Sequence, residues 1–191
     1  MIYLVRHGQT ELNQKHRLLG RTDVPMNEAG ISQAQSAAAL FQKNGVVFDA
    51  VYSSPLKRAV QTAKILAPNA PVITDERLIE MDYGPFEGMN LHRPSVKVIP
   101  FFLDFTHTPA PEGMEPLESV KERTLAFLQE FCCTNETILI STHAIAMKGI
   151  LENLTPSSNG GYWSKHIGNC EIYAFGWTKE GFSVPRPWPK N

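Results

Sequence analysis

Five side chains that could bind and transfer a phosphoryl group are spread along the first three quarters of the chain. They are two arginines, two histidines and a glutamate: Arg6, His7, Arg58, Glu80 and His143. A guanidinium offers a fork of donors that matches the oxygens of a phosphoryl group. An imidazole titrates near neutral pH, and one of its nitrogens can attack phosphorus and carry the group covalently. These residue types therefore fit phosphoryl transfer, provided that the fold brings them together.

The chain alternates short apolar runs with amphipathic segments. We expect strands where β-branched and aromatic residues gather, at 2–5, 48–53, 70–75, 137–142 and 170–177. We expect helices over 27–45, 53–67, 96–105, 116–131 and 144–154. This alternation predicts a three-layer α/β sandwich in which helices flank a mainly parallel central sheet. The proline-rich end, 184–191, is expected to be a surface tail.

The five candidates all lie near the carboxyl ends of expected strands. Arg6 and His7 follow the first strand, and Arg58 lies in the first turn of the helix after the second. Glu80 lies in the loop after the third strand, and His143 directly follows the fourth. Ligands of open α/β sheets bind outside the carboxyl ends of the strands, so we expect the five at one edge. Glycine at position 8 would let the backbone approach such a ligand closely.

Length and composition exclude several classes of protein. A chain of 191 residues is long enough for one sizeable core, and we expect a single domain over 1–191. A net charge of −1 gives no general attraction to nucleic acid or to an anionic membrane. The apolar runs are too short for a spanning helix, and the N-terminus does not resemble a signal peptide. Three cysteines, two of them adjacent, make no disulfide framework, so we expect a cytoplasmic protein.

The motifs around the five candidates resemble those of the histidine phosphatase superfamily, the phosphoglycerate mutase-like proteins. The resemblance covers most of the chain in five segments that follow the family's order: VRHGQTELN, GRTDVPMNEAGISQAQ, VYSSPLKRAVQTA, LIEMDYGPFEG and ILISTHA. It implies the phosphoglycerate mutase-like fold and an enzyme that needs neither a metal ion nor a cofactor. The sequence also offers no closely spaced set of metal ligands.

The resemblance further implies a role for each candidate. His7 would be the nucleophile that becomes phosphohistidine, while Arg6, Arg58 and His143 would hold the phosphoryl oxygens. Glu80 would protonate the leaving oxygen and then act as a base for the water that cleaves phosphohistidine. Asp82 lies in the same segment and stays open as the alternative acid.

Four further residues are expected to contact the substrate. Asn13 is similar to the family's amide contact to phosphate, and Gly20 with Arg21 matches its substrate-side loop. Arg21 also suggests a second acidic group on the substrate. Ala144 stands where the family usually has glycine, so its methyl group would narrow the site.

The expected activity is hydrolysis of a small phosphorylated metabolite, and two alternatives stay open. A phosphoglycerate mutase would use the same pocket, although mutases of this type are usually longer. A non-catalytic phospho-ligand-binding protein is disfavoured because the nucleophile and the acid are both present. The identity of the substrate depends on the segment 89–113, whose sequence pattern favours neither helix nor strand clearly. The sequence does not indicate the oligomeric state. The aromatic residues Phe101, Phe102 and Phe105 in that segment are more typical of a core than of a pocket wall.

Overall fold

The computed structural model describes residues 1–189 of the chain. A six-stranded sheet in the order β3-β2-β4-β1-β5-β8 forms the centre, and β6 and β7 form a separate hairpin. The strands are β1 (Ile2–Arg6), β2 (Ala50–Ser53), β3 (Val72–Thr74), β4 (Ile138–Thr142), β5 (Ile172–Phe175), β6 (Trp177–Thr178), β7 (Gly181–Phe182) and β8 (Arg186–Trp188). The helices are α1 (Glu11–Gln14), α2 (Glu28–Lys43), α3 (Lys57–Leu66), α4 (Ile99–Leu103), α5 (Leu117–Leu128), α6 (Ala144–Leu154) and α7 (Gly161–Ser164). Single 3₁₀ turns lie at Glu76–Leu78, Gly84–Phe86, Gln129–Phe131 and Pro156–Ser158.

Four neighbouring strands of the sheet run parallel to one another. Strand β4 pairs in parallel with β1 and β2, and β3 runs parallel to β2. The last two strands, β5 and β8, run antiparallel to their neighbours. The expected mainly parallel sheet is therefore confirmed.

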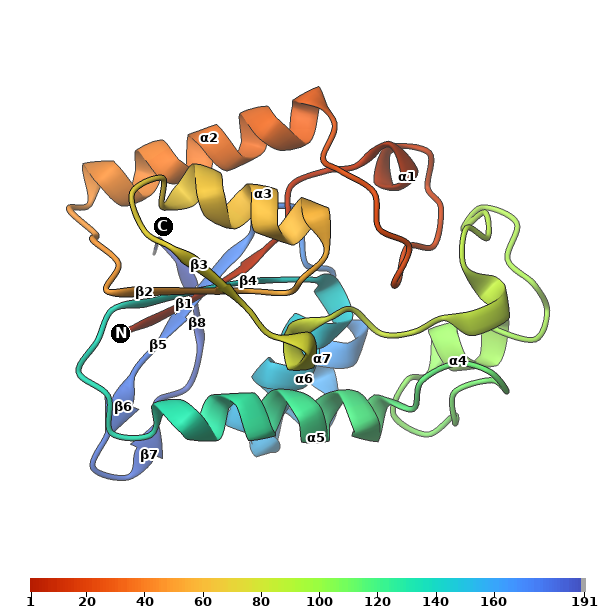
Figure 1. The fold of residues 1–191 in the computed structure, drawn as a ribbon. Coiled ribbons are helices and arrows are strands. Elements are labelled where there is room, and N and C mark those ends of the chain that lie inside the picture. Colours follow the sequence, from red (N-terminus) through yellow and green to blue (C-terminus); the bar gives the residue numbers. More distant parts are fainter. Residues whose placement is uncertain (190–191) are drawn as a thin grey trace.

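Helices cover both faces of this sheet. Figure 1 shows α2 and α3 on one face and α5, α6 and α7 on the other. Tyr3 and Val5 of β1 pack in one cluster with Phe41 of α2. Ile2 and Leu4, the alternate residues of the same strand, pack in the cluster on the opposite face. A strand buried on both sides must be apolar throughout, which is why this one reads as a continuous apolar run.

The carboxyl ends of β1, β2 and β4 lie level at one edge of the sheet. Arg6 is paired in register with Thr142, and Ser53 with Ser141. The residues that follow these strands therefore leave the sheet side by side. In Figure 1 the segments that carry α1 and α4 extend beyond this edge, on the right of the view.

A third hydrophobic cluster holds the long connection between β3 and α5 over this edge. Met81 and Phe101 of the connection pack together with Ile145 at the start of α6. Phe102 and Phe105 lie half-buried at the margin of the cluster, with their ring centroids 5.7 Å apart. Because this cluster links the connection to α6, it brings the segment around residue 80 to the beginning of that helix.

The expectation of a C-terminal surface tail was wrong. Residues 186–188 form β8, which pairs with β5 at the edge of the sheet. The Trp188 ring stacks on Phe41 with centroids 4.6 Å apart and meets Tyr3 edge-on at 5.1 Å. An edge strand tolerates proline because only one of its sides needs backbone donors. The last two residues of the expected tail, 190–191, lie outside the described residues.

The helix expected over 53–67 begins later than its sequence suggests. Helix α3 starts at Lys57, and its N-cap is Leu56, which makes no side-chain capping bond. Pro55 disfavours a helical backbone at the residue before it, the chain bends at 55–56, and Leu56 has extended dihedral angles. As a result the Ser54 hydroxyl does not cap the helix and is available for another partner.

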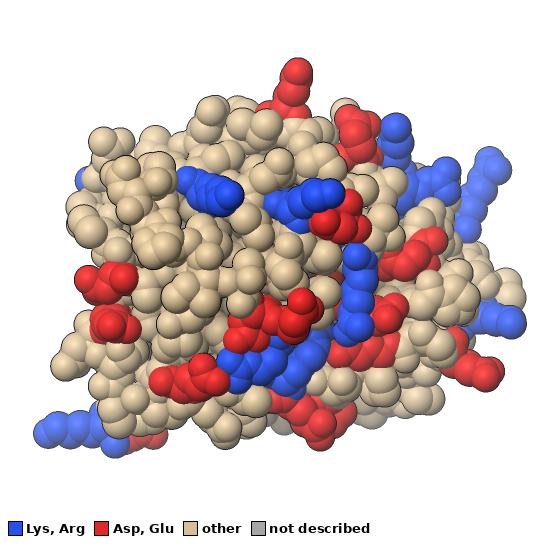
Figure 2. Space-filling model, viewed as in Figure 1, with Lys and Arg blue, Asp and Glu red and all other residues tan. Residues whose placement is uncertain are grey.

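Charged side chains of both signs are interspersed on the surface. Figure 2 shows acidic and basic residues next to one another on the face seen in Figure 1, in keeping with a net charge near zero. Among residues 1–189, no helix combines the length and the apolar character that crossing a membrane would need.

Candidate active site

His7 lies directly after the end of β1, and both of its ring nitrogens have hydrogen-bond partners. Its backbone N–H donates to Thr142 O at 2.9 Å, which continues the pairing with β4. Nδ1 lies 2.7 Å from Gly8 O, and Nε2 lies 3.3 Å from Nε of Arg58. Because an arginine nitrogen only donates, Nε2 is the acceptor and the proton is on Nδ1. Burial, followed by the charges of Arg6 and Arg58, lowers the pKa of His7 well below its ordinary value, so the ring is neutral at pH 7.

Arg58, in the first turn of α3, is held by backbone carbonyls. Nη1 donates to Thr22 O at 2.8 Å, and Nη2 donates to Gly20 O at 2.6 Å. The side chain is fully buried, and burial lowers its pKa to about 10, so it remains a cation at neutral pH. A buried cation held by neutral groups favours an anion beside it.

Arg6 and His143 each present a buried nitrogen without a partner. Nη1 of Arg6 donates to Ile167 O, but its Nε has no hydrogen-bond partner among the described residues. His143 follows β4, and its ring centroid lies 5.0 Å from that of His7. Its Nε2 lies 2.7 Å from Ser54 Oγ, whereas its Nδ1 has no partner in the described part of the chain. Buried donors without acceptors cost free energy, and a bound phosphoryl group would satisfy both nitrogens.

Glu80 lies buried against the first turn of α6, which begins directly after His143. Its Oε1 accepts hydrogen bonds from the backbone N–H groups of Ile145 and Ala146, each at 3.1 Å. Oε1 also accepts the N–H of Met81 at 2.9 Å. The N-terminus of α6 thus orients the Glu80 carboxylate near the ends of β1 and β4, the strands that His7 and His143 follow.

Asp82, the alternative acid, points away from this position. Its side chain is 43% exposed, and Oδ2 lies 3.5 Å from Nη1 of Arg21. Its Oδ1 accepts the backbone N–H of Gly84. The structure therefore brings Glu80, and not Asp82, close to Arg6 and Arg58. The negative charge of Glu80 raises the pKa values of both arginines, whereas burial lowers them.

The four expected substrate-contact residues are placed differently from one another. Asn13 lies near His7 in sequence, but its Oδ1 accepts the N–H and the hydroxyl of Thr10, so only its amide nitrogen is available to an anion. Gly20 turns its carbonyl oxygen to Arg58. Ala144 is the first residue of α6, between His143 and the amides that bind Glu80.

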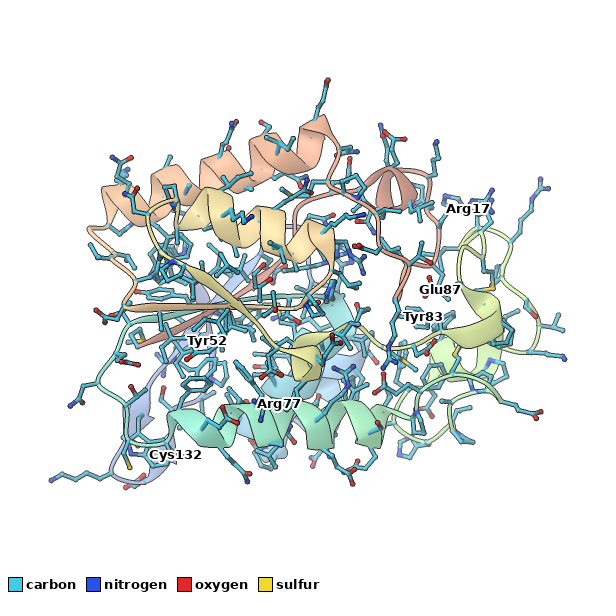
Figure 3. The ribbon with its side chains drawn as sticks, viewed as in Figure 1. Arg17, Tyr52, Arg77, Tyr83, Glu87 and Cys132 are labelled. Atoms are coloured by element: carbon cyan, nitrogen blue, oxygen red, sulfur yellow. The ribbon has the colours of Figure 1, made fainter. Side chains whose placement is uncertain are left out.

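Arg21 is an exposed residue that already has acidic partners. Nη2 lies 3.2 Å from Glu115 Oε2, and Nη1 faces Asp82. Figure 3 shows Tyr83 and Glu87 together at this end of the molecule, and Glu87 accepts the backbone N–H of Arg21. A second acidic group on the substrate would compete with these carboxylates for the Arg21 guanidinium.

Gly8 has a packing reason to be glycine, and the expectation that its backbone approaches a ligand stays a prediction. A Cβ at this position would collide with the carbonyl oxygen of Gly30 and, at 2.6 Å, with the sulfur of Met26. The Gly8 N–H donates to Thr62 Oγ1 at 3.1 Å. Glycine at position 8 therefore lets the start of α2 pack against the chain that leaves β1.

The family model described as histidine phosphatase superfamily (branch 1) matches residues 2–187. This chain belongs to the histidine phosphatase superfamily. The five candidate residues lie within the matched range, and the three-layer fold is that of the phosphoglycerate mutase-like members.

Named relatives support the same family. Phosphoserine phosphatase 1 of Hydrogenobacter thermophilus is 32% identical over 170 residues, which cover 85% of this chain and 80% of that protein. Phosphoglycerate mutase-like protein 4 of Arabidopsis thaliana is 33% identical over 167 residues, which cover 82% of this chain and 72% of that protein. The structure of Entamoeba histolytica phosphoserine phosphatase with 3-phosphoglyceric acid is 27% identical, with a TM-score of 0.83 and coverage of 100% and 95%. A mutant of that phosphatase with phosphoserine bound gives a TM-score of 0.82 at 27% identity, covering 98% of this chain and 94% of that one. This chain is thus an enzyme of the histidine phosphatase type that acts on a small phosphorylated metabolite.

One site residue, Ser54, and one buried cation that interacts electrostatically with Glu80, Lys148, are not evident from the sequence. Ser54 bonds His143, but in the sequence it looks like an ordinary helix cap. Lys148 lies one turn into α6, where an apolar pattern suggests only core. Its Nζ donates to Trp163 O at 2.7 Å, and burial lowers its pKa to about 8. The sequence signal that could have identified Lys148 is a lysine within an otherwise apolar helical stripe.

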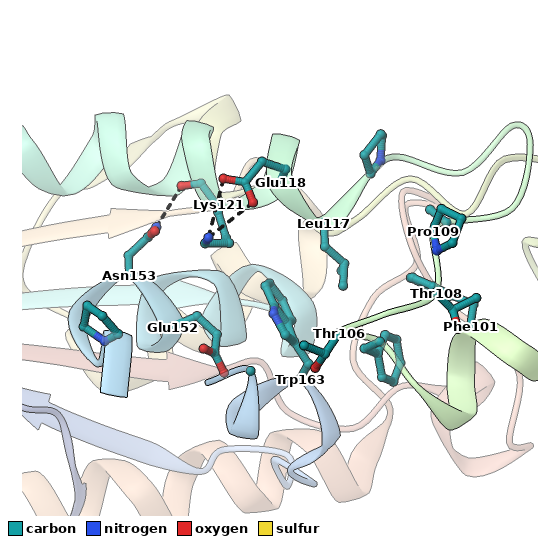
Figure 4. Close-up of a pocket in the computed structure, with 15 residues that line it drawn as sticks. Phe101, Thr106, Thr108, Pro109, Leu117, Glu118, Lys121, Glu152, Asn153 and Trp163 are labelled. Atoms are coloured by element: carbon teal, nitrogen blue, oxygen red, sulfur yellow. Dashed lines mark hydrogen bonds and ion pairs between the residues drawn. The ribbon is translucent and has the colours of Figure 1, made fainter. Parts of the chain in front are cut away.

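A separate cavity of about 650 Å³ lies against α5, the end of α6 and α7, away from the histidines. Figure 4 shows its rim, where Lys121 is held by Glu118 and the Asn153 amide donates to the Lys121 carbonyl. Phe101 and Phe105 line its wall. The buried unpaired nitrogens of Arg6 and His143 do not belong to the residues that line this cavity.

Proposed function

We propose that this histidine phosphatase hydrolyses small phosphomonoesters through a phosphohistidine formed on His7 Nε2. The observation that carries the proposal is the lone pair on this nitrogen, which is held by the donor of a buried guanidinium, Arg58, with the His143 ring and its unpaired Nδ1 nearby, 5.0 Å between ring centroids. In the proposed complex, Arg6, Arg58 and His143 bind the non-bridging phosphoryl oxygens, and Asn13 contributes its amide nitrogen.

The reaction would proceed in two steps. In the first, His7 Nε2 attacks phosphorus, the bond from phosphorus to the ester oxygen breaks, and Glu80 in its protonated form gives its proton to the leaving oxygen. In the second, the Glu80 carboxylate takes a proton from water as the water oxygen attacks phosphorus, and the bond to His7 breaks. The charge that develops on the phosphoryl oxygens is stabilised by the fixed guanidiniums.

We propose a phosphorylated small acid as the substrate class. Named relatives include a phosphoserine phosphatase, and the similar solved structures hold phosphoserine and 3-phosphoglyceric acid. These compounds share a phosphomonoester close to a carboxylate. A place for Gly20 and Arg21 beside the site is supported by the peptide unit that joins them, because its carbonyl accepts a hydrogen bond from Arg58 and its N–H donates one to Glu87.

The experiment is phosphate release from a panel of phosphomonoesters in EDTA, with His7→Ala as the control. The panel includes phosphoserine, 3-phosphoglycerate, a sugar phosphate and an aryl phosphate. Release that depends on His7 and ignores EDTA would support the metal-independent mechanism, and the ranking would test the acidic substrate class. Release that survives His7→Ala would overturn the mechanism.

A phosphoglycerate mutase activity is the second candidate, favoured by the similarity to the Arabidopsis mutase-like protein. A mutase would return the phosphoryl group to substrate and would require a bisphosphate primer. Conversion of 3-phosphoglycerate to 2-phosphoglycerate only after addition of 2,3-bisphosphoglycerate would establish it. Absence of both reactions would leave phospho-ligand binding without turnover.

We also propose that residues 1–191 act as one catalytic domain in the cytoplasm. Three hydrophobic clusters pack around one central sheet, which supports a single folding unit. A single unfolding transition, followed at the same denaturant concentration by fluorescence and circular dichroism, is the expected result. Fractionation of cells that express the tagged chain tests the location.

A further inference from the structure

We propose that Glu115 is a positioning residue that fixes the backbone on both sides of Glu80 and so places that carboxyl group for protonating the leaving oxygen. This inference rests on the proposed role of Glu80 as the general acid. Glu115 lies just before α5, at the end of the connection whose sequence pattern is mixed.

Asp82, two residues after the acid, is held by Glu115 twice. The Glu115 backbone N–H donates to Asp82 O at 2.8 Å. The Asp82 backbone N–H donates to Oε2 of Glu115 at 3.1 Å. Both backbone groups of Asp82 are therefore fixed by one residue that is distant in sequence.

The residue before Glu80 is held through an arginine that Glu115 orients. Nε and Nη2 of Arg123, on α5, donate to the two Glu115 carboxylate oxygens at 2.8 and 3.2 Å. Nη1 of the same guanidinium donates to Ile79 O at 2.6 Å and to Arg77 O at 2.8 Å. A forked pair fixes the guanidinium plane, so the carbonyl of Ile79 has a fixed donor.

Glu80 itself is tied to the same carboxylate by a third contact. Nη2 of Arg21 donates to Glu115 Oε2 at 3.2 Å, while its Nε donates to Glu80 O at 3.4 Å. The carbonyls of residues 79, 80 and 82 are thus all held by groups that converge on Glu115. The Glu80 carboxyl group extends from this clamped segment to the backbone N–H groups at the start of α6.

The carboxylate at the centre of this clamp is ionised at neutral pH. Burial acts to raise the pKa of Glu115, but the hydrogen bonds and charge of Arg123 outweigh burial and leave the pKa below its ordinary value. The side chain is only 9% exposed, and its forked partner Arg123 only 15%. A pair this enclosed holds its geometry better than a surface ion pair does.

A clamp on the acid predicts a loss that depends on the leaving group. An alkyl phosphate needs a proton on its departing oxygen, whereas p-nitrophenol departs without one. Displacement of the acid in Glu115→Gln should lower kcat/KM for phosphoserine by about 10- to 100-fold, because misplacement of a catalytic group by about 1 Å can cost about 100-fold. The kcat/KM for p-nitrophenyl phosphate should change little, because this ratio reports the first step alone, whereas kcat also contains the second step, in which Glu80 acts as the base for every substrate.

The test measures kcat/KM for both substrates in four proteins: wild type, Glu80→Gln, Glu115→Gln and the double variant. Glu118→Gln is the matched control, since that carboxylate is 69% exposed and pairs only with Lys121 at 3.2 Å. We expect Glu115→Gln to reproduce the leaving-group selectivity of Glu80→Gln in weaker form. We expect the double variant to lose no more on phosphoserine than Glu80→Gln alone, because the two residues act through one carboxyl group.

The outcomes separate the inference from the proposed function. Equal losses on both substrates in Glu115→Gln, with selectivity retained in Glu80→Gln, would make Glu115 merely structural and overturn the inference. Absence of selectivity in Glu80→Gln would instead overturn the role of Glu80, and the inference with it. Arg123→Lys, which keeps the charge but loses the fork, replaces Glu115→Gln if that variant does not fold, and the same comparison decides.

Discussion

The Nε nitrogen of Arg58 lies 3.3 Å from Nε2 of His7, and this contact determines which histidine nitrogen can react. The donor from Arg58 requires a lone pair on Nε2, and the Gly8 carbonyl accepts the proton on Nδ1 at 2.7 Å. The two contacts select a single tautomer before any substrate binds. In the proposed complex the phosphoryl oxygens would compete for the same guanidinium, so that the Arg58 donor would pass from His7 Nε2 to the group that His7 attacks.

Arg58→Lys should lower kcat/KM by about 10²- to 10³-fold, because catalysis loses oriented donors to the phosphoryl oxygens. A lysine retains the charge but cannot reach Gly20 O, Thr22 O and His7 together, as the guanidinium does. Steady-state kinetics on the best substrate of the panel measures the loss. The exposed neighbour Lys57, changed to Gln, is the control. A loss no larger than that of the control would contradict the role of Arg58.

His7 should remain neutral well below pH 6.5, and removal of a neighbouring cation should raise its pKa. Burial is the largest cause of the lowered pKa, and the charges of Arg6 and Arg58 act in the same direction. Arg58→Gln removes one positive charge, so protonation of His7 becomes easier and its titration moves to higher pH. NMR titration of the ligand-free protein, with the His7 ring signal assigned from its loss in His7→Ala, gives the shift directly. A titration that moves to lower pH, or not at all, would contradict this electrostatic account.

Ser54→Ala should allow His143 to populate both neutral tautomers instead of one. The Leu56 backbone N–H donates to Ser54 Oγ at 3.3 Å, which leaves the hydroxyl proton for Nε2 of His143 at 2.7 Å. Neutral His143 then carries its proton on Nδ1, the nitrogen that faces a phosphoryl oxygen in the proposed complex. We expect ¹⁵N NMR of the imidazole to show this tautomer in the wild type and a mixture in Ser54→Ala, with kcat/KM lowered by about 10-fold from the lost hydrogen bond.

Ser53→Ala is the matched control for this experiment. Its buried hydroxyl donates to the Ser54 carbonyl and makes no bond to His143. An unchanged ¹⁵N pattern in Ser54→Ala, or the same change in Ser53→Ala, would show that the hydroxyl of Ser54 does not set the tautomer.

Much of the sheet and its edge can be predicted from the sequence, because local patterns encode them. Continuous apolar runs mark β1 and β4 as buried strands, and the polar residue after each run then falls at the same edge. The sequence alone therefore predicts that His7 and His143 lie close together.

The rest of the site depends on contacts between segments that are distant in sequence, and local hydrophobic periodicity does not predict such contacts. Glu115 meets Asp82 and Arg123 only after α5 has packed, so in the sequence its carboxylate looks like any surface glutamate. Ser54 looks like a helix cap because serine before proline usually starts a helix, yet α3 begins only after Leu56. The strand at 186–188 is not predicted from the sequence because proline is unfavourable in a strand, except in one at the edge of a sheet.

Lys148→Met should remove a pH-dependent contribution to stability. Burial lowers the pKa of Lys148 from 10.5 to about 8. The unfolded chain therefore binds this proton more tightly, and between these pKa values it holds more protons than the folded protein does. Stability consequently rises with pH across that window, by about 3 kcal/mol for a shift of this size. Methionine has a similar length and packs well against the Phe105 ring, which lies 5.5 Å from Nζ.

Urea denaturation at pH 7 and pH 10 measures this effect as a difference between proteins, so that other titrating groups cancel. The free energy of unfolding of the wild type, relative to Lys148→Met, should increase from pH 7 to pH 10. Lys64→Met is the control, because Lys64 is exposed on α3 and should show no such trend. The loss of the Lys148 ammonium also leaves Trp163 O without its donor, which lowers stability equally at both pH values and so does not alter the difference. Parallel pH profiles for the wild type and Lys148→Met would mean that the Lys148 ammonium is hydrated in the folded protein and has the same pKa as in the unfolded chain, which would contradict the lowered pKa.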